Sequence, residues 1–346
     1  MNGGVRVTAR MAWLLTVVAA GSANDGSMTG MAVVMDHSGR IHWLWRVPVP
    51  RGNMTRASDF ALQANGHLTM FLPGLDTFAE RDLAGNLVRE WTDPAASWGA
   101  DGHEFRILPN GNALMIGHEK AVLDLSTTHL GGPEEAEVDV STVDEIVPDG
   151  RVVSHLSLYP AAGPDEAMAY IRDERGGIEF AHANSFDFTE DGHLLVSLLL
   201  TSSVLKVDRS TGEVLWRLGG TRSDFRFVDD PLDGFRGVHS VQALPGNHLL
   251  LFDNGLAGDR SGSRVVEYRL DEAAGTATRV WEYRHDPDIL CMAAGSVRRL
   301  PGGDTLVGWS PEGLVERVHP DGTLAWAGQG AYFYRAAFAE RLFPVP

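Results

Sequence analysis

Three histidines occupy the same position in three consecutive copies of an internal repeat. His103 lies in DGHEFRILPNGN, His182 in FAHANSFDFTEDGH and His239 in GVHSVQALPGNH. Neutral imidazole is nucleophilic near pH 7, and its ring nitrogens also donate and accept protons. Repeats arranged around an axis bring their equivalent positions together in space. We therefore expect these three histidines to form one catalytic or ligand-binding group.

The elements that must position them are short antiparallel strands. The first half of the repeat is an apolar strand, a tight turn and a second apolar strand, with Asn-Gly, Asp-Gly or Gly-Asn at the turn. Such pairs favour the positive φ that hairpins need. The second half is another hairpin, and five of its six copies end near a tryptophan. The five first halves are SDFALQANGHLTMF, HEFRILPNGNALMI, NSFDFTEDGHLLVS, HSVQALPGNHLLLF and GSVRRLPGGDTLVG.

Two hairpins per unit give four antiparallel strands, the content of one propeller blade. Because six second halves stand against five first halves, the missing half must come from the chain ends, residues 13–20 and AYFYRAAFAERLF. Such closure removes free sheet edges. We predict an all-β, six-bladed β-propeller closed by N- and C-terminal strands, with an open all-β solenoid as the alternative.

Composition excludes several functions. The chain has 346 residues and a net charge of −17, and its only lysines are Lys120 and Lys206. With no basic cluster, we expect no nucleic-acid partner. The single cysteine, Cys291, excludes an intramolecular disulfide and a zinc–thiolate site. The remaining histidines show no metal-ligand spacing, so we expect no metal and no organic cofactor.

The N-terminal residues 1–24 have two interpretations. Arg6 and Arg10 precede an apolar run, and Gly21-Ser22-Ala23 resembles a small-residue cleavage site, which together indicate a secretory signal. The same run could instead be the first propeller strand. Residues 25–346 are expected to form a single propeller domain. No stretch is long enough to span a bilayer, and we expect a periplasmic or secreted protein.

The chain also resembles the bacterial arylsulfotransferase family, whose members use no nucleotide sulfate donor. The motifs that carry the resemblance are HANSFDF, SSVLKVDRSTGEVLWRLGG, VHSVQALPGNHLLLFDNG and SRVVEYRLDEAAGTATRVWEY. HEFRILPNGN and the C-terminal YRA are similar to the family as well. The resemblance covers nearly the whole chain from about residue 30 onward.

The resemblance implies a six-bladed propeller with its active site in the central channel. It also implies ping-pong transfer of a sulfuryl group from an aryl sulfate donor to a phenol acceptor, with no cofactor. The family's transiently sulfated histidine matches His239. Two further histidines of the family, which hold the sulfate oxygens, match His182 and His103.

The sequence departs from the family at Leu199, where an arginine is expected. Losing a charge-assisted hydrogen bond to a sulfate oxygen costs about 1.5–3 kcal/mol, or roughly a tenfold to hundredfold loss of rate. Two arginines of the loop before His239, Arg222 and Arg236, could replace it, although acidic residues of the same loop could pair with them. Asn184 and Asn254 could add neutral donors, or could cap turns.

Two alternatives to a sulfotransferase remain. Leu199 and the acidic surface suggest a propeller that has lost catalysis and binds a ligand or partner. A metal-dependent, lactonase-type propeller is weaker, because it needs carboxylates pointing into the channel and the inward repeat positions hold histidines instead.

Overall fold

The computed structural model describes residues 12–19, 28–36, 40–49, 59–73, 75–172, 176–256, 260–330 and 332–339. The regular secondary structure of these residues is β-strand, apart from two one-turn 3₁₀ helices, η1 (Pro164–Glu166) and η2 (Ser310–Glu312). The all-β class predicted from the sequence is therefore confirmed. In the described part of the chain, no helix has the length and apolarity needed to cross a membrane.

Five sheets consist of consecutive strands and form the blades of a propeller. The first contains β4 (Phe60–Leu62), β5 (Leu68–Leu72), β6 (Thr77–Arg81) and β7 (Leu87–Trp91). The second contains β8 (Ala100–Ile107), β9 (Ala113–Leu123), β10 (Ala136–Ile146), β11 (Val152–Ser157), β12 (Ile171–Arg172) and β13 (Ile178–Glu179).

The other three blades follow the same order along the chain. The third contains β14 (Ala183–Phe188), β15 (Leu194–Leu198), β16 (Ser203–Val207) and β17 (Val214–Gly219). The fourth contains β18 (Arg226–Val228), β19 (Val238–Leu244), β20 (His248–Asp253), β21 (Arg264–Asp271) and β22 (Thr276–Tyr283). The fifth contains β23 (Ser296–Arg299), β24 (Thr305–Trp309), β25 (Leu314–Val318) and β26 (Leu324–Gln329).

A further sheet joins the two ends of the chain. Its strand order is β27 (Phe333–Ala339), β1 (Ala12–Ala19), β2 (Met28–Asp36) and β3 (Ile41–Val49). The predicted count of six blades is thus corrected to five blades of consecutive strands. The difference arises because the hairpin that ends near Trp43 belongs to this terminal sheet, whose remaining strands come from the two chain ends.

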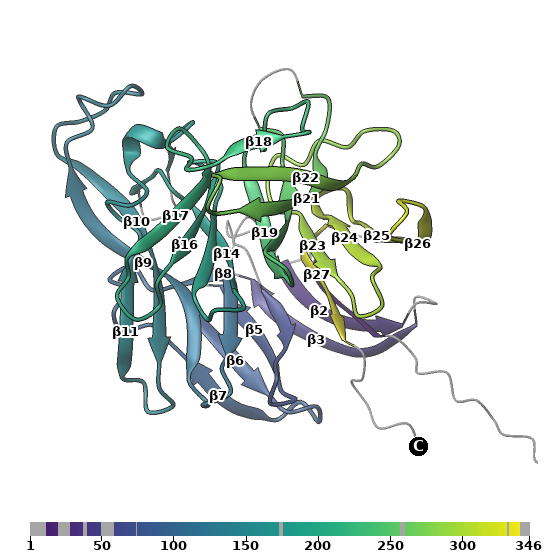
Figure 1. The fold of residues 1–346 in the computed structure, drawn as a ribbon. Helices are drawn as coiled ribbons and strands as arrows, with labels where there is room; N and C mark the ends of the chain where they lie inside the picture. Colours follow the sequence, from purple (N-terminus) through teal and green to yellow (C-terminus); the bar gives the residue numbers. More distant parts are fainter. Residues whose placement is uncertain are drawn as a thin grey trace, which may run out of the picture.

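The innermost strands of neighbouring sheets contact one another around the centre. β8 contacts β14, β14 contacts β19, β19 contacts β23, and β23 contacts β27, which in turn contacts β4. Figure 1 shows the labels of β8, β14, β19, β23 and β27 gathered in the middle of the molecule, with β7, β11 and β26 at its periphery. Side chains at the start of these strands therefore meet near one axis.

Turn chemistry and apolar alternation explain the blades. Gly111 and Gly192, in the predicted Asn-Gly and Asp-Gly turns, both adopt a φ of +84°, a value that a residue with a Cβ adopts only with strain. The main core lies between adjacent blades. Ile116 and Val140 of the second blade pack with Phe186 and Val196 of the third, as faces of neighbouring sheets do when each buries one side.

Candidate active site

Each histidine of the predicted group lies at an irregularity in an innermost strand. The β8–β9 pairing shifts register between Ala100 and Phe105, around His103. The β19–β20 pairing shifts immediately after His239, and His182 directly precedes the shifted start of β14. An irregularity of this kind bends a strand and turns a side chain away from the regular pleat. A register shift near the start of each innermost strand therefore turns the three imidazoles toward the centre.

The structure brings the three imidazoles together. The ring centroids of His103 and His182 lie 4.7 Å apart, and those of His182 and His239 lie 6.5 Å apart. His239 is 2% exposed, while the side chains of His103 and His182 are 13% and 19% exposed. His239 is therefore the most buried of the three.

Asn254 fixes the tautomer of His239. The Asn254 Nδ2 atom donates to the carbonyl oxygens of Cys291 and Ala294, at 2.9 Å each. The Oδ1 atom is therefore the acceptor, and it lies 2.7 Å from His239 Nδ1. His239 must carry its proton on Nδ1, which leaves the lone pair of Nε2 available. Asn254, predicted as a donor near the channel or a turn cap, instead orients the most buried histidine.

His239 is neutral at physiological pH. Burial holds the pKa of His239 well below its ordinary value, and the nearby charges of His182, His103 and Arg335 add to that effect. The hydrogen bond with Asn254 acts in the opposite direction but does not outweigh burial. A neutral imidazole with one available nitrogen is the form that attacks an electrophile.

His182 has the opposite electrostatic character. Burial alone would lower its pKa, but the carboxylate of Glu179, 2.8 Å from His182 Nδ1, more than offsets this and the pKa is raised. The contact is an ion pair rather than an aligned hydrogen bond. His182 also adopts a φ of +59°, a strained backbone for a residue with a side chain. The group thus combines a neutral histidine with one that favours its charged form.

His103 belongs to a hydrogen-bonded chain of alternating imidazoles and carboxylates. Asp101 lies 2.5 Å from His103 Nδ1 and 2.5 Å from His118 Nε2, and His118 Nδ1 lies 2.8 Å from Asp139. Burial lowers the pKa of His103 despite Asp101. The pKa of His118 is well above its ordinary value because two carboxylates outweigh its burial. Sequence reasoning assigned His118 no role, because its carboxylate partners are strand residues without a recognisable motif.

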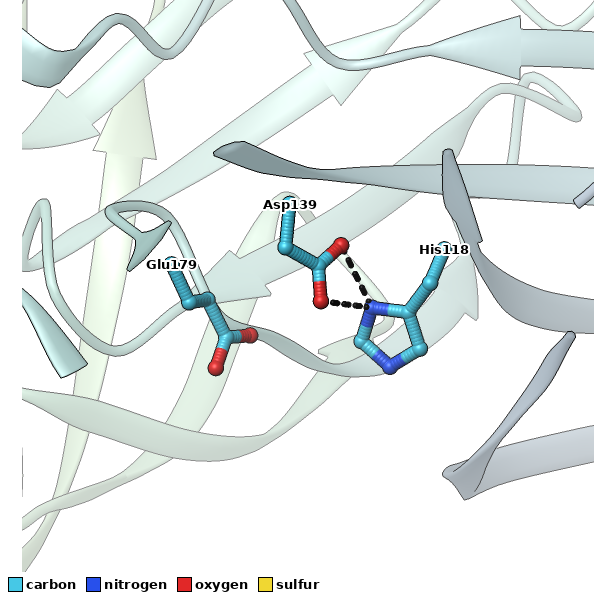
Figure 2. A group of neighbouring side chains, drawn as sticks. All are labelled: His118, Asp139 and Glu179. Carbon is cyan, nitrogen blue, oxygen red and sulfur yellow. Dashed lines mark hydrogen bonds and ion pairs between the residues drawn. The ribbon is translucent and has the colours of Figure 1, made fainter. Parts of the chain in front are cut away.

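The same region contains the donor set of a metal site. The side chains of His118, Asp139 and Glu179 are buried, and their ligand atoms all lie within 4.8 Å of one another. Figure 2 shows the Asp139 carboxylate against His118, with the Glu179 carboxylate beside this pair. One imidazole and two carboxylates could hold a divalent cation, but His118 is already bonded through both nitrogens. The sequence placed histidines at the inward repeat positions, but it did not reveal these carboxylates near them.

Two residues near the histidines were not predicted as site residues. The Tyr334 ring lies 5.4 Å from that of His103. Arg335 lies next to it on β27, and its side chain is 14% exposed. The signal in the sequence was the C-terminal YRA, which supported the family resemblance but suggested no role for these residues.

The other predicted residues are placed differently. Arg222 is half exposed and pairs with Glu166, away from the histidines. Arg236 donates through Nη1 to its neighbour Phe235's carbonyl oxygen at 2.9 Å. Asn184 is buried and donates to the carbonyl oxygen of Val238 at 2.8 Å, so it fixes the backbone next to His239. Leu199 is buried, and its N–H donates to the His182 carbonyl oxygen at 3.0 Å.

A cavity of about 430 Å³ lies elsewhere, between the third and fourth blades. Lys206, Trp216 and His248 line it, and none of the three central histidines does. The aromatic side chains of Phe180, Phe235 and Trp309 are fully buried packing residues.

The fold and the site define a propeller with a histidine group at its centre. The arylsulfotransferase (ASST) family model matches residues 6–315, nearly the whole chain, and the protein belongs to this family. No match was found among curated proteins.

The chain is similar to several solved structures at low sequence identity. A protein of unknown function from Bacteroides caccae has a TM-score of 0.57 and 13% identity, covering 95% of this chain and 98% of that one. Virginiamycin B lyase from Staphylococcus aureus has a TM-score of 0.47 and 10% identity, with 91% and 84% covered. The periplasmic gluconolactonase of Pseudomonas aeruginosa has a TM-score of 0.48 and 13% identity, with 95% and 98% covered. The Bacteroides caccae structure supports the fold but gives no information about function.

Proposed function

We propose that this protein is an aryl-sulfate sulfotransferase that works by a ping-pong mechanism through a sulfated His239. The observation that carries the proposal is the neutral His239, whose Nδ1–H is held by Asn254 while Nε2 remains available beside two further imidazoles. Family membership supports the same class of enzyme.

The first half-reaction transfers the sulfuryl group to the protein. His239 Nε2 attacks the sulfur of the aryl sulfate, and the bond between sulfur and the aryl oxygen breaks. The electron pair of that bond leaves with the phenolate. His182, whose raised pKa favours the protonated form, donates its proton to the phenolate as general acid. The developing charge on the three sulfuryl oxygens is stabilised by positioned donors, as in phosphoryl transfer.

The second half-reaction reverses these roles. An acceptor phenol occupies the place of the first product, and the now neutral His182 takes its hydroxyl proton. The phenol oxygen attacks the sulfur, the bond between sulfur and His239 Nε2 breaks, and the nitrogen recovers its lone pair. Asn254 holds the Nδ1 proton throughout. No other reactant is required, because the proton lost by His182 in the first step returns in the second.

The terminal sheet lies between two blades, because its innermost strand β27 contacts β23 on one side and β4 on the other. Location in the periplasm or outside the cell stays a prediction, which fractionation of the producing cells tests.

The alternative of a ligand-binding propeller without catalysis rests on Leu199. It is not favoured, because the histidine that would be sulfated keeps its orienting partner and its neutral form. Binding of a ligand without catalysis requires neither a fixed tautomer nor a neutral form of His239.

The proposal is tested by turnover of 4-nitrophenyl sulfate with and without a phenol. We expect release of nitrophenolate that depends on the phenol, and loss of at least about a hundredfold in His239→Asn. His248→Asn is the matched control, because His248 bonds Glu267 on an outer surface. Equal rates for wild type and His239→Asn would refute the proposal. Activity abolished by EDTA and restored by a divalent cation would instead favour a metal at His118, Asp139 and Glu179.

A further inference from the structure

We propose that Arg335 supplies the positive charge for the sulfuryl oxygens that an arginine at position 199 would otherwise provide. This inference rests on the proposed function, since it assigns one further residue to the same site. The transferring group is anionic, so its oxygens need positively charged donors. Leu199 is a buried apolar residue, and Arg222 and Arg236 bond Glu166 and the Phe235 carbonyl oxygen.

Arg335 occupies the position in its strand that corresponds to the three histidines. The β27–β1 pairing shifts register between Phe333 and Ala336, so Tyr334 and Arg335 lie at the irregularity. β27 is the innermost strand of the terminal sheet, as β8, β14 and β19 are of theirs. A register shift of the kind that turns His103, His182 and His239 toward the centre therefore occurs in this strand too.

Contacts place the guanidinium beside the histidine group. Arg335 Nη2 donates to the carbonyl oxygen of Asn184 at 3.2 Å, two residues from His182. Its neighbour Tyr334 packs against His103. The charge of Arg335 is close enough to His239 to contribute to the lowering of that histidine's pKa. Arg335 thus lies beside the group, and its partners are Asp59, Glu104 and Asn184 rather than the carboxylates that pair with His103 and His182.

The Arg335 guanidinium has more N–H groups than its three hydrogen bonds to described residues use. Nη1 donates to Asp59 at 3.1 Å and to Glu104 at 2.6 Å, and Nη2 makes the one bond to Asn184. Of the five N–H groups of an arginine, three are thus engaged with described residues. The Nε–H and one Nη2–H make no hydrogen bond within the described part of the chain. Two donors on a fixed guanidinium suit two oxygens of a sulfuryl group.

The carboxyl groups that hold Arg335 do not fully neutralise it. Burial raises the pKa of Asp59 to about 7, against the opposing charge of Arg335 and with the help of Glu104. Glu104 is also shared with Arg106, at 3.6 Å. Near neutral pH, Asp59 is therefore partly protonated, and Arg335 faces less than two full negative charges from Asp59 and Glu104. Above pH 7, Asp59 ionises and competes with an incoming anion for Arg335.

Two other arginines on innermost strands share the carboxylate of Asp187. Arg106 bonds Asp187 at 2.8 Å, and Arg298 lies 4.0 Å from the same carboxylate. Arg298 is half exposed and lies on β23, the neighbour of β27. It carries the same charge on an adjacent innermost strand without contacting the histidines, so Arg298→Gln is the matched control.

The test measures two properties of each variant. One is kcat and KM for 4-nitrophenyl sulfate with a phenol acceptor; the other is binding of inorganic sulfate by calorimetry. For Arg335→Gln we expect about a 10- to 100-fold fall in kcat and weaker sulfate binding, the usual size of a lost charge-assisted hydrogen bond. Arg335→Lys should retain part of both. Arg298→Gln should change either property less than about threefold, because its charge lies outside the group.

A variant that is expected to bind sulfate more tightly gives a result that misfolding cannot produce. Asp59→Asn removes the carboxylate that competes for Arg335, so it should bind sulfate more tightly than wild type above pH 7 and equally below it. Asp59→Asn with no such gain would contradict the inference, as would Arg335→Gln with wild-type kcat and sulfate affinity.

The outcomes separate this inference from the proposed function. A wild-type protein that binds sulfate through Arg335 but transfers nothing overturns the transferase and keeps the anion site. A wild-type protein that transfers sulfuryl groups while Arg335→Gln is undiminished overturns only the role of Arg335. A wild-type protein that neither binds sulfate nor transfers overturns both.

Discussion

The reactivity proposed for His239 depends on one neighbouring amide, that of Asn254. Asn254 uses its Nδ2 hydrogens on two backbone carbonyls, so its oxygen can only accept from His239 Nδ1. Replacing it by aspartate would keep an acceptor but add a negative charge that raises the pKa of the buried imidazole. Replacing it by alanine removes the orientation altogether. The proposed nucleophile therefore depends on two residues that lie fifteen positions apart.

We predict that Asn254→Ala lowers kcat for 4-nitrophenyl sulfate by about 10- to 100-fold, the usual effect of removing the partner that fixes a functional histidine. KM should change much less. Steady-state kinetics measure both quantities. Asn86→Ala is the control, because Asn86 bonds only Asp82 at an exposed turn. An unchanged kcat would show that His239 needs no fixed tautomer.

The lowered pKa of His239 makes a prediction about pH. A histidine of ordinary pKa loses its nucleophilic form as the pH falls through about 6.5. Burial, with the charges of His182, His103 and Arg335, moves this loss to more acidic pH in His239. We therefore expect the rate of protein sulfation at pH 5.5 to stay within about twofold of that at pH 7. Rapid-quench mass measurement follows it; a tenfold fall per unit below pH 6.5 would contradict the prediction.

At the scale of elements, a buried ion network supports the strand end that carries Asn254. Arg264, at the start of β21, is 1% exposed and donates to Asp253 at 2.9 Å and to Asp230 at 2.9 and 3.0 Å. Asp253 ends β20, directly before Asn254, and also accepts the N–H of Arg236. The guanidinium thus ties the fourth blade to the loop that leads into β19 and His239.

Removing this guanidinium should be strongly destabilising, because it leaves the buried carboxylate of Asp230 without its cation and leaves Asp253 with Arg260 alone. We predict that Arg264→Leu lowers the free energy of unfolding by about 3–5 kcal/mol. Urea unfolding followed by tryptophan fluorescence measures the loss. Arg269→Leu, five positions along the same strand and exposed, should cost less than about 0.5 kcal/mol. Similar midpoints for the two variants would show that the network contributes little.

Elements were predictable from the sequence because their signals are local. The Asn-Gly and Asp-Gly turns and the apolar alternation mark the hairpins, and the register of the repeat places His103, His182 and His239 alike. Arg335 and its partners could not be found this way. Arg335 lies 231 positions from Glu104 and 276 from Asp59. These pairings exist only because the last strand, β27, pairs with β1 in the terminal sheet and contacts β4. Likewise, nothing local shows that Asp101 bonds two histidines.

At the scale of the whole molecule, β27 has two tasks. It pairs with β1 and so joins the chain ends, and it carries Tyr334 and Arg335 to the histidine group. The Ala336 N–H donates to Ser296 Oγ of the neighbouring blade at 3.1 Å. The pairing of the two chain ends and the candidate anion site therefore depend on the same strand, β27. A change that destabilises this strand should also weaken anion binding.

Proline substitution tests this dependence. Ala336→Pro removes the donor to Ser296, and a buried polar group left without a partner costs about 1–3 kcal/mol. We expect a lower Tm, weaker sulfate binding and association through the freed edge of β1, seen by calorimetry and size-exclusion chromatography. Ala325→Pro is the control, because Ala325 is exposed at a register shift on the outer strand β26. Matching behaviour of the two variants would contradict a closing role for β27.

The central claim is that His239 carries the sulfuryl group between donor and acceptor. The most direct measurement is to mix the protein with 4-nitrophenyl sulfate without a phenol, quench it, and locate any added mass by peptide mapping. The account predicts one equivalent of nitrophenolate, a sulfuryl-sized mass increase confined to the peptide that contains His239, and its loss when phenol is added. Release of nitrophenolate without an adduct, or an adduct on another residue, would contradict it.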